Sequence, residues 1–401
     1  MSPTVLYTAF DVVPSPKGAS THITYFVRGL VQAGYEVHLL TAGTPGLPAE
    51  GTYEGARIWR FQSQDTNFLR RAMAFSRMVA HHLATHPDYA VVHFRSIWSG
   101  LPAVRAGDGR RPPYRTVYEV NGLPSIELKY HYPALRNQPL LEKLRQQEVF
   151  ALHRADRILC PSRVTREYIR SLGIPPERIV VIPNGVDPTR FAPRPVEPTE
   201  PPTLLYVGTL ASWQGVETAL DAMPHILAER PVRLRIVGGG RKARLKMLRR
   251  RIRKQGLTDW VSLEGPLPPD QIPELINQAT ICLAPLGYND RNVTQGCSPI
   301  KLLEYMACRR PVVAANLPVV RELMREGVDA LLFTPDDPGD LARAVLRLLD
   351  DPALADRLAE AAYQRVRREF TWHTAQERLL EVYREMGAGG RQGAGSGRRE
   401  T

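Results

Sequence analysis

Residues 298–307 (SPIKLLEYMA) contain the side chains best suited to holding a phosphorylated ligand. Ser298 is a favoured N-cap residue and Pro299 is favoured at the first helical position, so we expect a helix to begin there. Lys301 then falls in the first turn, where a cation opposes the helix macrodipole by about 0.3–1 kcal/mol. An anion at that helix end would remove the conflict. The segment therefore predicts an anion site, and a diphosphate is the obvious ligand.

Glu304 lies three residues after Lys301, on the same face of the predicted helix. A carboxylate only accepts hydrogen bonds, which suits the vicinal hydroxyls of a ribose. A solvent-facing Lys–Glu pair is the alternative, because surface helices often carry one at this spacing. The unfavourable place of Lys301 in the first turn favours the ligand-binding interpretation.

Gly18 follows the first predicted strand and precedes its helix. A residue without a side chain lets backbone N–H groups approach an anion at the positive end of a helix. The sequence around it has no G-x-G-x-x-G pattern, so a dinucleotide site is not supported. A plain turn remains the alternative. Asn184-Gly185 is likewise a strong turn signal, and it would also let a sugar or nucleotide come close to the backbone.

Two further glycine clusters lie at the carboxyl ends of consecutive predicted strands. They are YVGTLASWQG at 206–215 and IVGGG at 236–240. Two such clusters beside each other indicate that a ligand lies close to the backbone, at positions where a side chain would block it. Ordinary turns between strands and helices are the alternative interpretation.

The elements that position these segments alternate regularly between short apolar strands and helix-length stretches. This alternation predicts right-handed crossovers and parallel sheets that helices cover on both faces. A helix is expected from about Ser20 to Gly34. The strands are expected at residues 5–10, 37–40, 91–94, 116–120, 157–160 and 179–182, and then at 204–207, 234–237, 261–263, 281–284 and 312–315.

A change in composition divides the chain into two α/β halves of Rossmann-like size. Six prolines between Pro188 and Pro202 predict a semi-rigid linker. We therefore expect a first domain at 1–190, a linker at 191–202 and a second domain at 203–365. A Gly/Arg/Ser tail at 387–401 is expected to be disordered. Ligands of such sheets bind beyond the carboxyl ends of the strands, so a cleft between the domains is the expected site.

The overall composition is that of an ordinary globular protein. The chain has 401 residues, of which 43% are apolar and 23% charged, and this excludes wholesale disorder. No run of eighteen apolar residues occurs, so no membrane-spanning helix is expected, and the first residues do not resemble a secretion signal. Cys160, Cys282, Cys297 and Cys308 fit neither a zinc site nor a disulfide framework. We expect a reducing, cytosolic location.

The formal net charge of +12 points to an acidic partner such as phosphate, nucleic acid or anionic lipid. Residues 241–254 hold nine Lys or Arg and no Asp or Glu, with Leu245, Leu248 and Ile252 on one helical face. This pattern favours a solvated outer face. A peripheral contact with an anionic membrane, at its inner face, remains the alternative, since each basic residue near a charged leaflet adds about 1 kcal/mol. No nucleic-acid partner is expected, because no recognised binding module accompanies the charge.

Five motifs occur in a fixed order along the chain: ADRILCPS (155–162), IPNGVD (182–187), YVGTLASWQGVETALDAM (206–223), VGGG (237–240) and SPIKLLEYMACRRPVVA (298–314). Taken together they resemble glycosyltransferase family 4. The match runs from the first strand to about residue 372. It is most similar to a bacterial subgroup with Trp-x-Gly and Ser-Pro-x-Lys-Leu-x-Glu-Tyr-Met-Ala variants.

This resemblance implies the GT-B fold, in which two Rossmann-like domains face each other across a cleft. It also implies that a helix at 366–386 crosses back to the first domain. The activity it implies is retaining transfer of a sugar from a UDP- or GDP-linked donor, with no metal and no other cofactor. The first domain would lie on the acceptor side and the second would bind the donor. The expected acceptor is a glycan or a lipid-linked molecule in cell-envelope or exopolysaccharide synthesis.

The resemblance also assigns roles to single residues. Glu304 matches the glutamate that binds the donor ribose, and Gly18 matches the loop glycine near the diphosphate. The backbone of 298–301 matches the loop that meets phosphate and sugar. A retaining, front-face path is implied, in which a leaving phosphate oxygen takes the acceptor proton.

The sequence departs from the family pattern at several positions. The first glutamate of the family's Glu-x7-Glu pair would fall at Gly296, and its diphosphate-binding Arg and Lys would fall at Thr209 and Gln214. The first-domain histidine of many members is replaced within 118–121. Lys301 and then Arg291 are the expected replacements for the lost positive charges.

The candidate site residues fall into three groups. Lys301 and Glu304 are the expected catalytic residues, Glu119 and Asn121 are expected on the acceptor side, and no metal ligand is expected. The expected donor-binding residues are Gly18, Gly208, Thr209, Gln214, Gly238, Gly239, Arg291, Ser298, Pro299, Ile300, Lys301 and Glu304.

Two functions of different classes remain open. The first is an active glycosyltransferase. The second is a non-catalytic GT-B protein that binds nucleotide or glycan and serves a partner enzyme, which the departures from the family pattern favour. A GT-B phosphorylase or epimerase is a third, less favoured interpretation, and the sequence has no motif for a pyridoxal-phosphate lysine.

Overall fold

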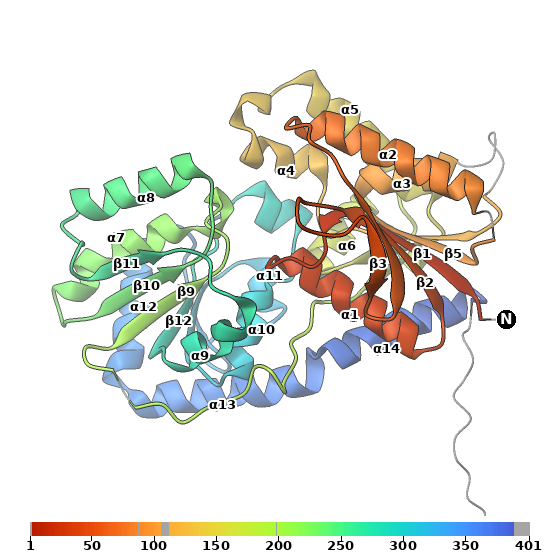
Figure 1. The fold of residues 1–401 in the computed structure, drawn as a ribbon. Helices are drawn as coiled ribbons and strands as arrows, with labels where there is room; N and C mark the ends of the chain where they lie inside the picture. The colour runs from red at the N-terminus through yellow and green to blue at the C-terminus, as the bar shows by residue number, and fades with distance from the viewer. Residues whose placement is uncertain (1, 87, 106–111, 198, 389–401) are drawn as a thin grey trace, which may run out of the picture.

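Two mostly parallel sheets, each covered by helices, lie side by side in the computed structural model (Figure 1), which describes residues 2–86, 88–105, 112–197 and 199–388. The first sheet has the order β3-β4-β2-β1-β5-β6-β7-β8, and the second has the order β11-β10-β9-β12-β13-β14. All described strand pairs are parallel except the antiparallel pair β3–β4. The predicted α/β fold with two Rossmann-like domains is confirmed.

The first domain contains the elements from β1 to β8. Its central strands are buried on both faces, which is why they are nearly continuous apolar runs in the sequence. The strands are β1 (Thr4–Val12), β2 (Glu36–Ala42), β3 (Glu50–Tyr53), β4 (Ala56–Phe61), β5 (Val91–Arg95), β6 (Arg115–Glu119), β7 (Arg157–Cys160) and β8 (Ile179–Val181). The helices are α1 (Gly18–Gln32), α2 (Phe68–Thr85), α3 (Ser96–Arg105), α4 (Pro124–His131), α5 (Pro139–Arg154) and α6 (Arg163–Ser171).

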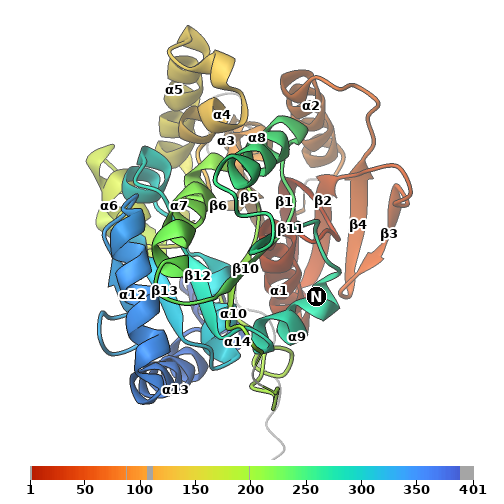
Figure 2. The same ribbon diagram turned by 90° about the vertical axis from the view of Figure 1, so that its left-hand side faces the viewer.

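The second domain repeats the alternation, and Figure 2 views it from its own side. Its strands are β9 (Thr203–Val207), β10 (Arg233–Val237), β11 (Val261–Glu264), β12 (Ile281–Ala284), β13 (Val312–Ala315) and β14 (Leu331–Phe333). The helices are α7 (Val216–Leu227), α8 (Lys242–Lys254), α9 (Ile272–Asn277), α10 (Ile300–Ala307), α11 (Pro318–Arg321), α12 (Pro338–Asp350) and α13 (Pro352–Glu369). The last helix, α14 (Trp372–Glu385), packs on the first domain. Short 3-10 turns lie at Pro133–Leu135, Pro176–Arg178, Ser212–Gln214 and Pro269–Gln271, and a π-helical turn lies at Arg291–Gln295.

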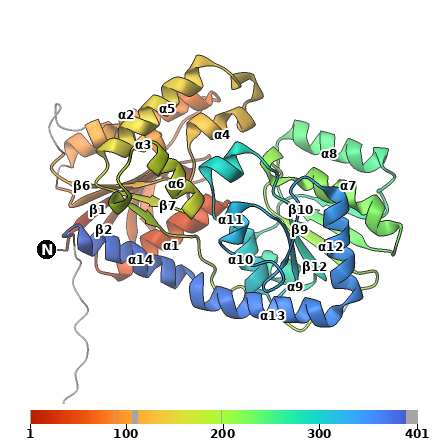
Figure 3. The same cartoon turned by 180° about the vertical axis from the view of Figure 1, so that it is seen from behind.

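The two domains are connected twice, by the proline-rich segment and by the last helices. The Asn277 side chain accepts the Arg194 N–H at 2.9 Å and donates to the Ala192 carbonyl at 3.0 Å, so the segment packs on the second domain. Figure 3 shows α13 along the second domain and α14 along the first. Trp372 at the start of α14 stacks on Tyr25 of α1 with 4.8 Å between ring centroids. The predicted helix that returns to the first domain is therefore confirmed.

Some predicted boundaries were wrong. Helix α1 begins at Gly18 and not near Ser20, because the Ser20 hydroxyl instead accepts the N–H of Ser15 at 2.9 Å. Strands β3, β4 and β14 were not predicted. Of the predicted tail, residues 389–401 lie outside the described residues, whereas Ala388 is buried and its carbonyl accepts a hydrogen bond from Tyr35. No helix in the described part of the chain has both the length and the apolar character that a bilayer requires.

Candidate active site between the two domains

The N-termini of α1 and α10 meet at the boundary between the domains. A Cβ built on Gly18, the first residue of α1, would lie 3.1 Å from Cδ1 of Ile300, the first residue of α10. The first turns, GAST and IKLL, carry no acidic side chain. Both helices therefore present uncompensated positive ends to the same region, which suits an anion.

Lys301 points from α10 toward the end of β9. Its Nζ donates to the Tyr206 hydroxyl at 2.9 Å and to Oε1 of Gln214 at 2.6 Å, and it lies 4.2 Å from the centre of the Tyr206 ring. Burial lowers the pKa of Lys301 to about 7. Lys301 and Glu304 are both partly buried, and the Lys301 ammonium contacts Tyr206 and Gln214, so the two residues are not the solvent-facing pair of the alternative interpretation.

Glu304 lies one turn further along α10 and is half-buried. Burial raises the pKa of its carboxyl to about 7, against the opposing effect of Arg190 and Lys301. A buried carboxyl group is stabilised when hydroxyl groups donate hydrogen bonds to it, and a ribose can supply two such hydroxyl groups.

The glycines at the ends of β9 and β10 leave the backbone bare beside Lys301. A Cβ on Gly208, where φ is +145°, would lie 2.9 Å from Lys301 Nζ. A Cβ on Gly238, where φ is +152°, would lie 1.8 Å from the Gly208 carbonyl oxygen. The Thr209 carbonyl accepts from Tyr206 at 2.7 Å, and the Gly239 carbonyl accepts from Leu210 at 2.8 Å. The structure thus brings Gly208, Thr209, Gln214, Gly238 and Gly239 together around the start of α10.

Arg291 lies in the π-helical turn, a type of distortion that is frequent at functional sites. Its guanidinium lies 5.0 Å from the ring centre of Trp213. Its Nε donates to Oε1 of Glu127, on α4 of the first domain, at 3.2 Å. The charge of Arg291 is therefore partly neutralised across the domain boundary, and Lys301 is the better placed of the two cations.

Ser298 is not the N-cap of α10, contrary to prediction. The helix begins at Ile300, Pro299 occupies the cap position, and no described side chain caps it. The Ser298 hydroxyl instead accepts the N–H of Asn184 at 3.1 Å, and its carbonyl accepts from Asn184 Nδ2 at 2.6 Å. A partner 114 residues away in the sequence thus outcompetes the local cap.

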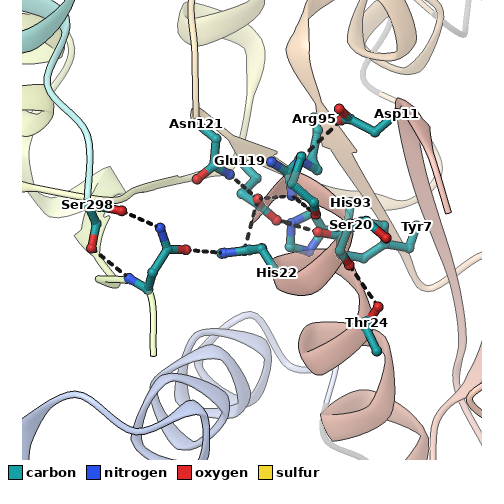
Figure 4. A network of polar contacts seen from close by, with 12 residues as sticks. Tyr7, Asp11, Ser20, His22, Thr24, His93, Arg95, Glu119, Asn121 and Ser298 are labelled. Atoms are coloured by element: carbon teal, nitrogen blue, oxygen red, sulfur yellow. Dashed lines mark hydrogen bonds and ion pairs between the residues drawn. The ribbon is translucent and has the colours of Figure 1, made fainter. Parts of the chain in front are cut away.

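Glu119 is too deeply buried to contact an acceptor, which corrects its predicted role. It is 2% exposed and accepts hydrogen bonds from Tyr7, from His93 at 3.0 Å and from Asn121, with Arg95 at 3.2 Å (Figure 4). Burial disfavours its charged form, but Arg95 and His22 hold the pKa of Glu119 well below its usual range. Asn121 is half-buried and donates to Glu119, so its amide serves this network.

Four residues of this region were not among the candidate site residues, although the sequence already indicated the turn at Asn184 and the segment 206–215: His22, Asn184, Tyr206 and Trp213. Tyr206 and Trp213 lie inside the glycine-rich segment 206–215, where an aromatic residue beside predicted turns was an available signal. His22 and Asn184 are buried and meet only in the folded chain, with Nδ1 and Oδ1 2.7 Å apart. No local pattern could have paired them.

A separate cavity of about 550 Å³ lies elsewhere, lined in part by Arg115 and Arg157. These are the first residues of β6 and β7, so the cavity is at the amino ends of the strands, whereas ligands of such sheets bind at the carboxyl ends. Within the described ranges, no three His, Cys, Asp or Glu side chains are grouped as metal ligands.

Comparison with known families decides what kind of domains these are. Residues 16–190 match the family described as Glycosyltransferase Family 4, and residues 201–351 match Glycosyl transferases group 1. Each half of the chain therefore matches a glycosyltransferase family model. The family resemblance in the sequence is confirmed at this level, and both families belong to the transferases.

Curated relatives are glycosyltransferases as well. D-inositol 3-phosphate glycosyltransferase of Thermobispora bispora is 31% identical over 268 residues, which are 62% of this chain and 60% of the relative. Alpha-D-kanosaminyltransferase of Streptomyces kanamyceticus is 31% identical over 46% of each chain. The chain therefore spans about half of these relatives' lengths. A D-inositol 3-phosphate glycosyltransferase of Kineococcus radiotolerans is 26% identical over 92% of this chain and 90% of its own.

Solved structures share the fold over nearly the whole chain. Sucrose-phosphate synthase from Thermosynechococcus elongatus superposes with a TM-score of 0.83 at 21% identity, over 97% of this chain and 100% of that one. HepE of Anabaena, solved with UDP and glucose, gives a TM-score of 0.73 at 18% identity, over 96% and 100%. The two-domain GT-B fold is thereby shown.

Proposed function

We propose that this protein is a retaining glycosyltransferase that moves a sugar from a nucleotide-diphospho-sugar to a glycan or lipid-linked acceptor in cell-envelope or exopolysaccharide synthesis. The observation that carries the proposal is the meeting of two positive helix ends beside Lys301, at the glycine-lined ends of β9 and β10. A structure of HepE with UDP-glucose, which shares this fold, supports a nucleotide-sugar donor. The basic stripe at 241–254 supports a lipid-linked or cell-envelope acceptor.

In the proposed reaction the residues of this chain act mainly on the leaving group. The bond between the anomeric carbon and the diphosphate oxygen breaks, and the acceptor oxygen bonds to the same face of that carbon. The acceptor proton passes to the leaving oxygen. The amides at the start of α10 and the Lys301 ammonium stabilise the departing diphosphate, because preorganised positive charge is most effective where negative charge develops. Glu304 accepts hydrogen bonds from the ribose.

A membrane contact through α8 is part of this proposal. Arg244 pairs with Glu217 and Arg251 with Asp221, both on α7, so these two arginines serve the fold. The remaining cations of the helix are exposed and form no ion pair with any described residue. They are Lys242, Lys246, Arg249, Arg250, Arg253 and Lys254. This set, the α8 basic face, lies at the outer edge of the second domain (Figures 1 and 2) and would hold the protein on an anionic inner membrane surface.

A non-catalytic nucleotide- or glycan-binding protein is the second candidate. The uncharged Thr209 and Gln214, and the contact of Arg291 with Glu127, favour it. A panel of UDP-, GDP- and ADP-sugars distinguishes the two functions when transfer and slow hydrolysis are both assayed. We expect turnover of one donor by the wild type and its loss in Lys301→Ala and Glu304→Ala. Nucleotide binding without turnover of any donor would favour the second candidate.

A further inference from the structure

A chain of buried polar contacts runs from the core of the first domain to the loop that begins α10. Asn184, which is 9% exposed, makes two hydrogen bonds to Ser298, one from its backbone N–H to the hydroxyl and one from Nδ2 to the carbonyl. Because Asn184 belongs to the turn after β8, these bonds fix a loop of the second domain to the first domain.

His22 orients the Asn184 side chain. Since Asn184 Nδ2 donates to a carbonyl, its Oδ1 must accept, and His22 Nδ1 lies 2.7 Å from it. His22 Nδ1 therefore carries the hydrogen. Its Nε2 lies 3.0 Å from Oε1 of Glu119, the carboxylate at the centre of the buried network (Figure 4).

The start of α14 packs against both His22 and the turn that carries Asn184. The His22 ring packs edge-on against Trp372, with 5.6 Å between ring centroids. A Cβ on Gly185 would lie 2.3 Å from the Trp372 backbone nitrogen, so the turn that carries Asn184 is pressed against the start of α14. His22 is 3% and Asn184 is 9% exposed, so both side chains are enclosed by the protein.

We propose that His22 and Asn184 are positioning residues for the donor diphosphate. The Asn184 side chain, which His22 orients, holds the Ser298 carbonyl and thereby keeps Ser298 where the Asn184 backbone N–H occupies its hydroxyl, so the hydroxyl does not cap α10. The first amides of a helix have no partner within the helix, so without a cap they stay available to an anion. The proposal rests on the proposed function, and it explains why a serine with strong capping preference is placed here and not used as a cap.

Substitutions at these two residues separate positioning from packing. The amide nitrogen of asparagine can replace the Nδ1–H of histidine, whereas that of glutamine replaces Nε2. We therefore expect His22→Asn to bind nucleoside diphosphate nearly as well as the wild type, and His22→Gln and Asn184→Ala to bind about tenfold more weakly, the loss of one hydrogen bond. Tyr25→Phe is the matched control, because it removes the 2.8 Å bond from α1 to Asp187 in the same turn without touching Ser298.

The experiment titrates each variant with UDP, GDP and ADP by calorimetry and follows hydrogen exchange of residues 297–303. Faster exchange in Asn184→Ala than in Tyr25→Phe, with weaker diphosphate binding, supports the positioning role of His22 and Asn184. Equal losses in all variants, or unchanged binding and exchange in Asn184→Ala, overturn it. If the wild type binds none of the nucleotides, the proposed function is contradicted. The exchange comparison alone then supports or overturns the claim that His22 and Asn184 position the loop at the start of α10.

Discussion

At the residue scale, Lys301 is the side chain on which the proposed chemistry depends. Burial lowers its pKa to about 7, so much of the population is uncharged at pH 8 when the site is empty. A diphosphate against Nζ favours the charged form and raises the pKa. Binding at pH 8 is therefore expected to take up as much as about one proton, measured by calorimetry in buffers of different ionisation enthalpy.

Lys301→Met should abolish this proton uptake and weaken binding about tenfold or more, because a charge-assisted hydrogen bond is lost. Lys246→Met, on the exposed α8 basic face, is the control and should match the wild type. Proton uptake that persists in Lys301→Met would show that another group titrates.

Glu304 makes the free energy of unfolding depend on pH. Burial raises its pKa from 4.5 to about 7, so between these values the folded state binds more protons than the unfolded state. The stability that Glu304 contributes therefore falls as the pH rises through this range. Glu304→Gln should melt close to the wild type at pH 4 and above it at pH 8.

Melting curves from pH 4 to 8.5 test this expectation, with the exposed Glu142→Gln as the control that should track the wild type at every pH. A difference between Glu304→Gln and the wild type that does not change with pH would contradict it.

At the scale of elements, the ends of β9 and β10 are shaped by contact with α10. A side chain on Gly208 would meet Lys301 Nζ and would have to adopt a φ of +145°. Gly208→Ala is therefore expected to displace Lys301 and to weaken nucleotide binding at least about tenfold. Gly265→Ala, after β11, is the control, since nothing lies within 4 Å of its Cβ and its stability should stay within about 0.5 kcal/mol. Equal binding by both variants would contradict the assignment.

The α8 basic face makes its own prediction. Replacing Lys246, Arg249, Arg250 and Arg253 with glutamate should abolish co-sedimentation with vesicles rich in anionic lipid at low salt, since each cation contributes about 1 kcal/mol. The control changes the same net charge on exposed arginines of α12, α13 and α14: Arg347, Arg357, Arg367 and Arg378. If both variants lose binding equally, total charge and not α8 is responsible.

At the scale of the whole molecule, the two domains are joined on more than one side of the site. On α4, Glu127 accepts from Arg291 and Gln295, and Lys129 and Tyr130 pair with Asp290. At the start of α6, the backbone N–H groups of Arg163 and Val164 donate to Glu322 at 2.8 and 3.1 Å. These contacts fix the relative position of the two domains, in which the first residues of α1 and α10 lie side by side.

The sequence predicted this architecture because its signals are local. Buried parallel strands are short apolar runs, so most strands lie within a residue or two of their expected positions. Strand β3 was not predicted because its side chains are largely exposed and form no apolar run. Strand β4 has the sequence ARIWRF, in which Arg60 is buried while Trp59 and Phe61 lie on the less buried face. Its sequence therefore does not alternate between apolar and polar residues.

Contacts between distant segments were the part that the sequence could not supply. Capping preference predicted a role for Ser298 that a partner 114 residues away prevents. The basic stripe at 241–254 gave no sign that Arg244 and Arg251 pair with acids on α7. Glu119 was assigned to the acceptor by its place at the end of a strand, whereas the fold surrounds it with donors. Lys301 could be singled out because a cation in the first turn of a helix is a local signal. The structure places it in the first turn of α10, with its ammonium beside Tyr206 and Gln214.

The central claim is that the region between the N-termini of α1 and α10 holds the diphosphate of a nucleotide. Thermal unfolding with UDP, GDP and ADP, compared with the matching monophosphates, tests it most directly. Binding at one hundred times the Kd adds about 2.7 kcal/mol, so one diphosphate should raise the melting temperature clearly, its monophosphate much less, and Lys301→Met should remove the difference. No shift with any of the three diphosphates, or a full shift in Lys301→Met, would contradict the claim.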